Sequence, residues 1–253
     1  MNKSKTISKR FNLIAIGGDP KTRKGQGKGW LTAIMYLVPF GQLGTKNHCP
    51  SASEGCGEGC LFKQGRGQMT NVQNARLKKT LFFEDDETGF IHQLREDITK
   101  AIKWTESKGY KLAIRLNGTS DIAWERFHLF ERFPRLQFYD YTKSAFRLNR
   151  NLPANYHLTF SQSETNQEKA KQLAQQGENV AVVFRHKLPS KYYGRDVIDG
   201  DKNDLRFLDP KKSIVGLLAK GSAKKDQTGF VVDAFDKERF CPTSDKGCKT
   251  SSF

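Results

Sequence analysis

Residues 111–141 read KLAIRLNGTSDIAWERFHLFERFPRLQFYDY, and this stretch decides the fold. Its first six residues, KLAIRL, and its last six, LQFYDY, are short apolar runs that predict β-strands. Residues 122–133 between them, IAWERFHLFERF, predict a helix. A strand, a helix and a second strand at this spacing are typical of a βαβ unit, in which the two strands run parallel.

The same alternation continues on both sides of this stretch. Upstream, apolar residues recur on one face of a helix that we expect to end near Ser107, before Gly109: Phe90, Ile91, Leu94, Ile98, Ala101 and Ile102. Downstream, residues 144–150 and 164–177 predict helices, and residues 157–160, 179–184 and 213–219 predict strands. The chain is therefore predicted to be an α/β protein whose parallel βα units form a full or partial (βα) barrel.

The charge of the chain points to an acidic partner. Its 253 residues include 43 Lys and Arg against 27 Asp and Glu, a formal net charge of +16. DNA or RNA is the first candidate for such a partner. The hydrophobic fraction of 36% is too high for a disordered basic tail, so a folded protein is expected. No run approaches the roughly 18 apolar residues that cross a bilayer, and we expect no membrane association.

Two domains of different character are predicted. Residues 1–29 are rich in lysine and arginine and end in the glycine-punctuated sequence GQGKGW, which predicts a basic, flexible arm. Residues 30–253 are predicted to form a single α/β domain with cysteine-bearing segments near both ends. The five cysteines are an odd number and no secretion signal is recognisable, so we expect a cytoplasmic protein with reduced thiols.

Two similar octapeptides supply four of the five cysteines. CPSASEGC at residues 49–56 and CPTSDKGC at residues 241–248 share Cys, Pro, a hydroxyl residue, Gly and Cys in register. Thiolates are ligands for zinc and for iron–sulfur clusters. We therefore expect one metal centre, an iron–sulfur cluster or zinc, held by Cys49, Cys56, Cys60, Cys241 and Cys248. The alternative is that the five cysteines are reduced and structurally incidental.

Polar residues follow several predicted strands. The carboxyl ends of parallel strands meet at one edge of a sheet, where α/β proteins place their active sites. We expect a catalytic cleft there, formed by Asp121, Tyr141, Lys143, Ser161 and Glu164. Asp121 and Glu164 are the acid/base candidates, Lys143 would stabilise developing negative charge, and Tyr141 would donate a hydrogen bond or stack on a base. The simpler alternative is that the two acids cap the helices that follow them.

Basic residues in the arm, in residues 61–80 and at two strand ends are candidates for phosphate binding. Phe62, Phe82 and Phe83 lie among them or beside them, as in proteins that combine cations with stacking rings, although core packing is the simpler explanation for Phe82 and Phe83. The predicted nucleic-acid contacts are Lys21, Arg23, Lys24, Lys28, Lys63, Arg66, Arg76, Lys78, Lys79, Arg185 and Lys220.

An ordered set of motifs resembles a known family. These motifs are TKNHCPSASEGCGEGCLFKQGRG (45–67), RLNGTSDIAWE (115–125), FYDYTKS (138–144), LPANYHLTFSQSE (152–164) and the terminal CP…C. Over roughly residues 30–248 the chain resembles the phage gene product 88 family. The resemblance implies a phage or mobile-element origin and a barrel like that of radical S-adenosylmethionine enzymes, but no settled reaction. S-adenosylmethionine stays an open option, because no binding motif for it stands out.

Three classes of function compete. The first is a nucleic-acid-associated enzyme with a cysteine-bound iron–sulfur cluster or zinc and a strand-end cleft. The second is a non-enzymatic DNA- or RNA-binding or host-interaction protein in which the metal is structural. The third is a tyrosine-dependent nickase that initiates replication, with Tyr139 or Tyr141 as nucleophile, although the five histidines lack the paired spacing of its metal site.

Overall fold

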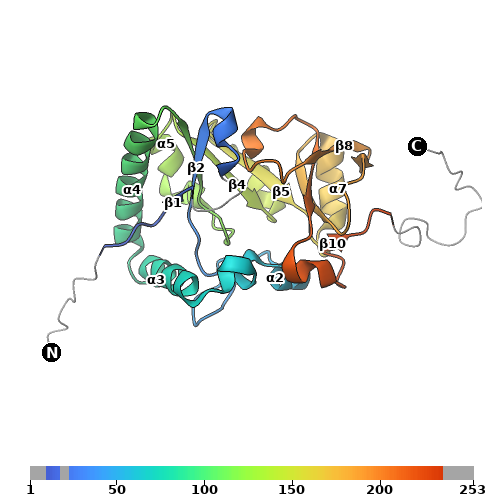
Figure 1. Ribbon diagram of the computed structural model, residues 1–253, viewed down its shortest axis with the longest axis horizontal. Helices are drawn as coiled ribbons and strands as arrows, with labels where there is room; N and C mark the ends of the chain where they lie inside the picture. The colour runs from blue at the N-terminus through green and yellow to red at the C-terminus, as the bar shows by residue number, and fades with distance from the viewer. Residues whose placement is uncertain (1–9, 18–22, 236–253) are drawn as a thin grey trace, which may run out of the picture.

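The computed structural model describes residues 10–17 and 23–235, and a mostly parallel ten-stranded sheet forms its centre (Figure 1). The strand order is β1-β2-β3-β4-β5-β6-β9-β8-β7, with β10 also paired to β6. The neighbouring strands from β2 to β8 run parallel, and β1 and β7 pair antiparallel at the two ends. The parallel strands are β2 (Trp30–Ile34), β3 (Lys111–Arg115), β4 (Gln137–Thr142), β5 (Tyr156–Ser161), β6 (Val180–Phe184), β9 (Ile214–Leu218) and β8 (Arg195–Asp199).

The predicted α/β class and parallel sheet are confirmed. Strands were expected at residues 111–116, 136–141, 157–160, 179–184 and 213–219, and β3, β4, β5, β6 and β9 occupy these positions. The path of strands has two ends, β1 (Ala15–Ile16) and β7 (Lys191–Tyr192), so the described sheet is open and does not close into a full barrel. The strands β1, β2, β7, β8 and β10 were not predicted.

The described residues form six α-helices. They are α2 (Glu54–Glu58), α3 (Thr70–Asp85), α4 (Glu87–Ser107), α5 (Leu129–Arg132), α6 (Ala145–Leu148) and α7 (Gln167–Gln176). The helix predicted to end near Ser107 is α4, and Gly109 after it has φ +74°, the left-handed conformation that ends helices. The helix predicted over 122–133 is instead split into the 3₁₀ turn η4 (Trp124–Phe127) and α5, because His128 between them has φ +51°.

The alternation of side chains along β3 separates two layers. Leu112 and Ile114 join the large core beneath α4, which also contains Phe90, Leu94 and Ile98 of that helix. Ala113 instead joins a small cluster on the opposite face with Tyr139 and Leu205. The other strands and short turns are β10 (Val231–Val232), η1 (Gln26–Lys28), η2 (Leu61–Lys63), η3 (Gly65–Gln68), η5 (Arg206–Leu208) and η6 (Gly221–Lys225).

The segment after β8 covers that second face. Phe207 of η5 packs edge-on against Trp30 of β2, with ring centroids 4.9 Å apart, and lies 5.6 Å from the ring of Tyr139 on β4. Asp204 just before η5 binds Arg115 and Tyr139 from two neighbouring strands. A segment from one end of the sheet thus reaches strands near the other end, across the face opposite α4.

Residues 10–17 belong to the folded domain, which corrects the predicted arm boundary at residue 29. Ala15 and Ile16 pair with β2, and the side chain of Leu13 is fully buried in the main core. The Arg10 guanidinium forms an ion pair with Asp97 at 3.1 Å. The basic composition of this segment masked a short apolar strand that completes the edge of the sheet. No helix among the described residues is long and apolar enough to span a membrane.

Candidate functional site

A cavity of about 450 Å³ lies at the carboxyl ends of the parallel strands. Its walls include residues that end or follow β2, β3, β4, β5, β6 and β9, as the predicted topology requires: Ile34, Tyr36, Arg115, Asn117, Tyr141, Lys143, Ser161, Val183 and Leu217. In Figure 1, α2 and the segment leading to β10 lie together at this end of the sheet. Cavities of this size in α/β proteins are ordinary ligand sites.

Four of the five predicted cleft residues line this cavity. Asp121, Tyr141, Lys143 and Ser161 are among its lining residues, and Glu164 is not. Glu164 instead accepts hydrogen bonds from the Ser53 hydroxyl and from the Gly55 backbone N–H, both at 2.7 Å. Its carboxylate therefore holds the loop that carries the cysteines.

That loop, residues 49–60, forms one wall of the cavity through Cys49, Cys56 and Cys60. Ser53 caps the short helix α2, since its side-chain oxygen accepts a hydrogen bond from the Cys56 N–H at 3.3 Å. Gly55 lets the loop approach the segment before β10, because a Cβ there would lie 2.1 Å from the Thr228 hydroxyl. The cysteine loop is thus held by Glu164 after β5 and packs closely against the segment before β10.

Burial acts on two of the three thiols, Cys49 and Cys60. Burial raises the pKa of Cys49, and the nearby Cys60 and Cys56 raise it further by charge repulsion. Burial is also the largest cause that raises the pKa of Cys60. A hydrogen bond from the Phe62 N–H lowers this pKa, and charge repulsion by Cys56 raises it to a smaller extent. The thiols are therefore close enough to interact electrostatically, and a bound cation would relieve the cost of deprotonating them.

Within the described residues, no group of three or more His, Cys, Asp or Glu side chains is arranged as a metal site. Three of the five predicted ligands nevertheless line one cavity from a single twelve-residue loop. Cys241 and Cys248 lie outside the described residues. The donor chemistry of the loop, three thiols on one wall, fits a thiophilic metal or cluster.

Lys143 and Ser161 meet because of strand register. Tyr141 on β4 pairs with Thr159 on β5, and Thr142 pairs with Phe160, so the next residues, Lys143 and Ser161, lie opposite each other. The Lys143 ammonium donates a hydrogen bond to the Ser161 hydroxyl at 2.8 Å. Among the described residues, Lys143 forms no ion pair with a carboxylate, so its positive charge stays available in the cavity.

Asp121 is held in a network of its own. Its carboxylate pairs with the Arg147 guanidinium at 2.7 Å and accepts hydrogen bonds from the Thr142 hydroxyl and the Lys143 N–H. Arg147 is 4% exposed and also pairs with Glu125 at 3.0 Å. These contacts suit an acid that positions Lys143 more than an acid that exchanges protons.

Arg115 and Asp204 form the floor of the cavity, and the sequence patterns did not single them out. Arg115 Nη1 donates to Asp204 Oδ2 at 3.0 Å, and its guanidinium lies 4.7 Å from the centre of the Tyr141 ring. The Asp204 carboxylate also accepts a hydrogen bond from the Tyr139 hydroxyl at 2.9 Å. A charged residue inside the apolar run KLAIRL was a usable signal for Arg115, whereas nothing in the sequence near Asp204 indicates that it crosses the sheet.

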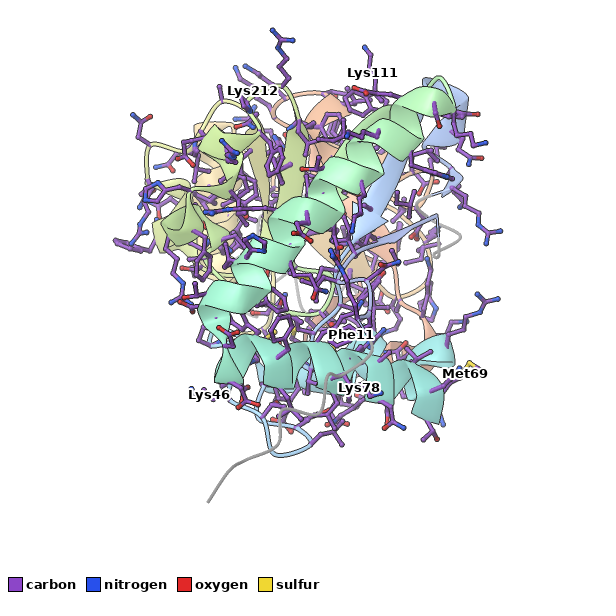
Figure 2. All side chains as sticks on the ribbon, turned by 90° about the vertical axis from the view of Figure 1, so that its left-hand side faces the viewer. Phe11, Lys46, Met69, Lys78, Lys111 and Lys212 are labelled. Carbon is purple, nitrogen blue, oxygen red and sulfur yellow. The ribbon has the colours of Figure 1, made fainter. Side chains whose placement is uncertain are left out.

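The predicted nucleic-acid contacts separate into exposed and buried residues. Arg23, Lys24, Lys28, Arg66, Lys78 and Lys220 are exposed, Lys63 is half-buried and paired with Glu58, and Lys21 lies outside the described residues. Lys78 projects from α3 at the surface shown in Figure 2.

Three of these predicted contacts have their cationic groups turned inward, Arg76 fully and Lys79 and Arg185 in part. The Arg76 guanidinium is buried over the Tyr36 ring, 4.8 Å from its centre, and Lys79 donates to the Leu13 carbonyl. Arg185 donates to the carbonyls of Lys224 and Asp226, at 2.9 and 2.8 Å. The sequence pattern missed these roles because long cationic side chains can turn inward and bind carbonyls or aromatic rings.

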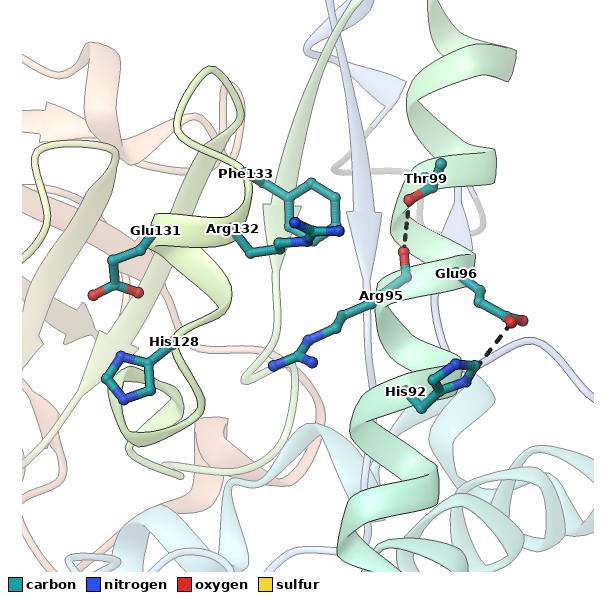
Figure 3. A pocket seen from close by; sticks show the side chains of 8 residues that line it. All are labelled: His92, Arg95, Glu96, Thr99, His128, Glu131, Arg132 and Phe133. Carbon is teal, nitrogen blue, oxygen red and sulfur yellow. Dashed lines mark hydrogen bonds and ion pairs between the residues drawn. The ribbon is translucent and has the colours of Figure 1, made fainter.

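A larger hollow between α4 and α5 is a weaker candidate. Figure 3 shows its lining side chains standing apart around an open space. Several of its polar groups already have partners: His92 lies 3.7 Å from Glu96, the Thr99 hydroxyl donates to the Arg95 carbonyl, and the Arg95 guanidinium donates to the Phe127 carbonyl. It contains no cysteine and lies away from the strand ends, so the cavity beside the cysteine loop is the better site.

A comparison with family models found one match. The model described as gene product 88 matches residues 9–234, which is most of the chain. The chain belongs to the gene product 88 family. The searches of curated proteins and of solved structures gave no match. The family match begins at residue 9, in agreement with the burial of Leu13 in this gene product 88 protein.

Proposed function

We propose that this gene product 88 protein is a phage or mobile-element enzyme that acts on DNA or RNA in the strand-end cavity. Its cysteine loop would hold an iron–sulfur cluster or zinc, with Cys241 and Cys248 as further ligands. The observation that carries this proposal is that Cys49, Cys56 and Cys60 line the same cavity as Lys143 and Asp121. The sheet, although open, would then act as a partial barrel.

The arrangement of the thiols favours a reactive centre. A structural zinc is enclosed by four protein ligands, whereas a cluster held by three cysteines keeps one iron open to a ligand. The cysteine loop presents three thiols to a cavity. If these three alone held a cluster, the open iron would supply redox chemistry or bind S-adenosylmethionine there, whereas coordination by Cys241 or Cys248 would close that position. Lys143, positioned by Asp121 and Ser161, would stabilise negative charge that develops on the substrate.

Nucleic acid is the substrate class that agrees with the charge. The formal net charge is +16, and the exposed members of the predicted contacts still include cations near residues 23–28, 66 and 78. A polyanionic substrate would be attracted to this surface before one of its units enters the cavity.

One observation favours the non-enzymatic alternative, a nucleic-acid-binding or host-interaction protein with a structural metal. Cys56 packs against a small core of Ala219, Ala223, Phe230 and Val231, so the cysteine loop also ties the end of the described chain to the sheet. In that case, removal of the metal would lower the unfolding temperature strongly without exposing a reactive centre.

The environment of the tyrosines disfavours the nickase hypothesis. Burial raises the pKa of both Tyr139 and Tyr141, so each phenol is a poorer nucleophile than a solvated one. The Tyr139 hydroxyl also donates to Asp204 inside the fold. Neither hydroxyl is placed to attack a phosphodiester.

The proposal is tested by anaerobic purification followed by absorbance, iron, sulfide and zinc analysis. We expect a brown protein with iron and sulfide, or a colourless one with stoichiometric zinc. Single Ala variants of Cys49, Cys56 and Cys60 should lose most of the metal. Cys241→Ala and Cys248→Ala are the matched comparison, because a loss there as well indicates a centre shared with the terminal octapeptide. Full metal content in all three loop variants would overturn the proposal.

A further inference from the structure

The cavity contains two cations from neighbouring strands that the cysteine loop does not require as ligands. Arg115 ends β3, and Lys143 follows β4 directly. Tyr141 connects the two cations. The Arg115 guanidinium lies 4.7 Å from the centre of the Tyr141 ring, and Lys143, two residues after Tyr141, points to the same face of the sheet. Both cations and the Tyr141 ring line the cavity.

Neither cation uses its full capacity for hydrogen bonds. A guanidinium has five N–H donors, and among the described residues Arg115 donates only to Asp204, through Nη1. Its side chain keeps 14% of its surface exposed, and Nε has no partner in the described part of the chain. Lys143 has three donors, and within the described part of the chain its ammonium donates one hydrogen bond, to the Ser161 hydroxyl, and lies 5.5 Å from the centre of the Phe230 ring.

Three cations and three carboxylates line the cavity, and the carboxylates are all paired. Asp204 pairs with Arg115, Asp201 pairs with Lys220 at 2.7 Å, and Asp121 pairs with Arg147. Each lining carboxylate thus has a cationic partner, and Lys143 is the lining cation without a carboxylate partner among the described residues. A half-buried ammonium beside a partly free guanidinium favours an oxyanion with several acceptor oxygens.

The remaining walls suit a planar apolar group. The rings of Tyr36, Phe40 and Phe230 line the cavity together with Ile34 and Leu217. Nucleobases stack on aromatic rings and fill cavities of this size, while phosphates are bound by guanidinium, ammonium and hydroxyl donors. Both halves of a nucleotide therefore find matching groups in one cavity.

We propose that Arg115, Lys143 and Ser161 form a phosphate subsite that anchors one nucleotide in the cavity, with its base against the aromatic walls. The inference rests on the proposed function, because it specifies which part of a nucleic acid enters the site. Enzymes that act on bases take the target nucleotide out of the stack into such a pocket. The phosphate would come from a unit of a strand or from a free nucleotide.

The test uses the full-length protein and three probes: thymidine, thymidine 5′-monophosphate and a ten-residue oligodeoxythymidine. Binding is followed by calorimetry and by the shift in unfolding temperature. The wild type should bind the monophosphate at least about tenfold more tightly than thymidine, because charge-assisted bonds to phosphate are among the stronger hydrogen bonds. Tighter binding of the oligonucleotide than of the monophosphate identifies the strand as the source of the phosphate, and the reverse identifies the free nucleotide.

Lys143→Met should remove most of the preference for the monophosphate over thymidine. Lys103→Met is the matched control, since Lys103 is an exposed lysine of α4 outside the cavity, and it should keep that preference. Arg115→Lys should weaken phosphate binding while keeping the charge. Tyr110→Phe serves as a control for handling, because it changes an aromatic residue outside the cavity.

The inference is overturned if the monophosphate and thymidine bind equally, or if Lys143→Met and Lys103→Met weaken monophosphate binding to the same extent. It is also overturned if Lys143→Met lowers the metal content and leaves nucleotide binding intact, because Lys143 then serves the cysteine loop. Metal analysis on the same samples separates this failure from failure of the proposed function, which would show as metal-free wild-type protein.

Discussion

Glu164→Gln tests whether a carboxylate outside the cavity holds the cysteine loop in place. Glu164 accepts two short hydrogen bonds from that loop, from the Ser53 hydroxyl and the Gly55 N–H, each 2.7 Å long. Hydrogen bonds to a charged group contribute about 1.5–3 kcal/mol each, and a glutamine keeps one acceptor oxygen. We therefore expect the free energy of unfolding to fall by about 1.5–3 kcal/mol, the loss of one such bond.

The same substitution should lower the metal content. Ser53 links Glu164 to Cys56, because it donates to the carboxylate and accepts from the Cys56 N–H. Urea unfolding measures the stability, and metal analysis after anaerobic purification measures the occupancy. Glu178→Gln is the control, because Glu178 is exposed and a surface substitution changes stability by no more than about 0.5 kcal/mol. If Glu164→Gln matches wild type in both stability and metal content, Glu164 does not position the loop.

Three further predictions concern buried groups. Burial lowers the pKa of Lys79 to about 8, so between pH 8 and the ordinary pKa of lysine the unfolded state holds the proton and the folded state does not. The stability of the wild type relative to Lys79→Met, measured by urea unfolding, should therefore rise by about 3 kcal/mol from pH 7 to pH 10.5. A difference that stays constant with pH would contradict this. Gly55→Ala should lower the free energy of unfolding by about 1–3 kcal/mol, since the new Cβ would meet Thr228. Gly27→Ala is the control and should not lower it, because the space around Gly27 is open. Equal unfolding midpoints for the two variants would refute the contact. Asp121→Asn should lower stability by about 1.5–3 kcal/mol in thermal or urea unfolding by weakening the Arg147 pair, and an unchanged midpoint would remove Asp121 from the network.

Local patterns predicted the elements that repeat. The runs at residues 111–116 and 179–184 became β3 and β6, because short apolar segments between helices have few other places in an α/β fold. The parallel topology then placed Asp121, Tyr141, Lys143 and Ser161 around one cavity, as expected from the shared carboxyl edge of the strands.

Side-chain direction was harder to predict than position. Residues 61–80 looked like a basic surface, but α3 turns Arg76 inward while Lys78 stays exposed, so the cations of this segment divide between the interior and the solvent. Glu164 follows a strand as the pattern required, yet its carboxylate faces the cysteine loop instead of the cavity. Asp204 reaches Arg115 across 89 residues of sequence, and contacts at such separation leave no local signal.

The account depends most on the claim that the cysteine loop binds a metal at the cavity. X-ray absorption at the metal edge tests this directly, because it counts the sulfur ligands and measures their distances. We predict three or four sulfurs at about 2.3 Å in the wild type, and loss of this signal when Cys49, Cys56 and Cys60 are all changed to Ala. A metal bound only through nitrogen and oxygen, or a sulfur shell that persists in the triple variant, would contradict the claim.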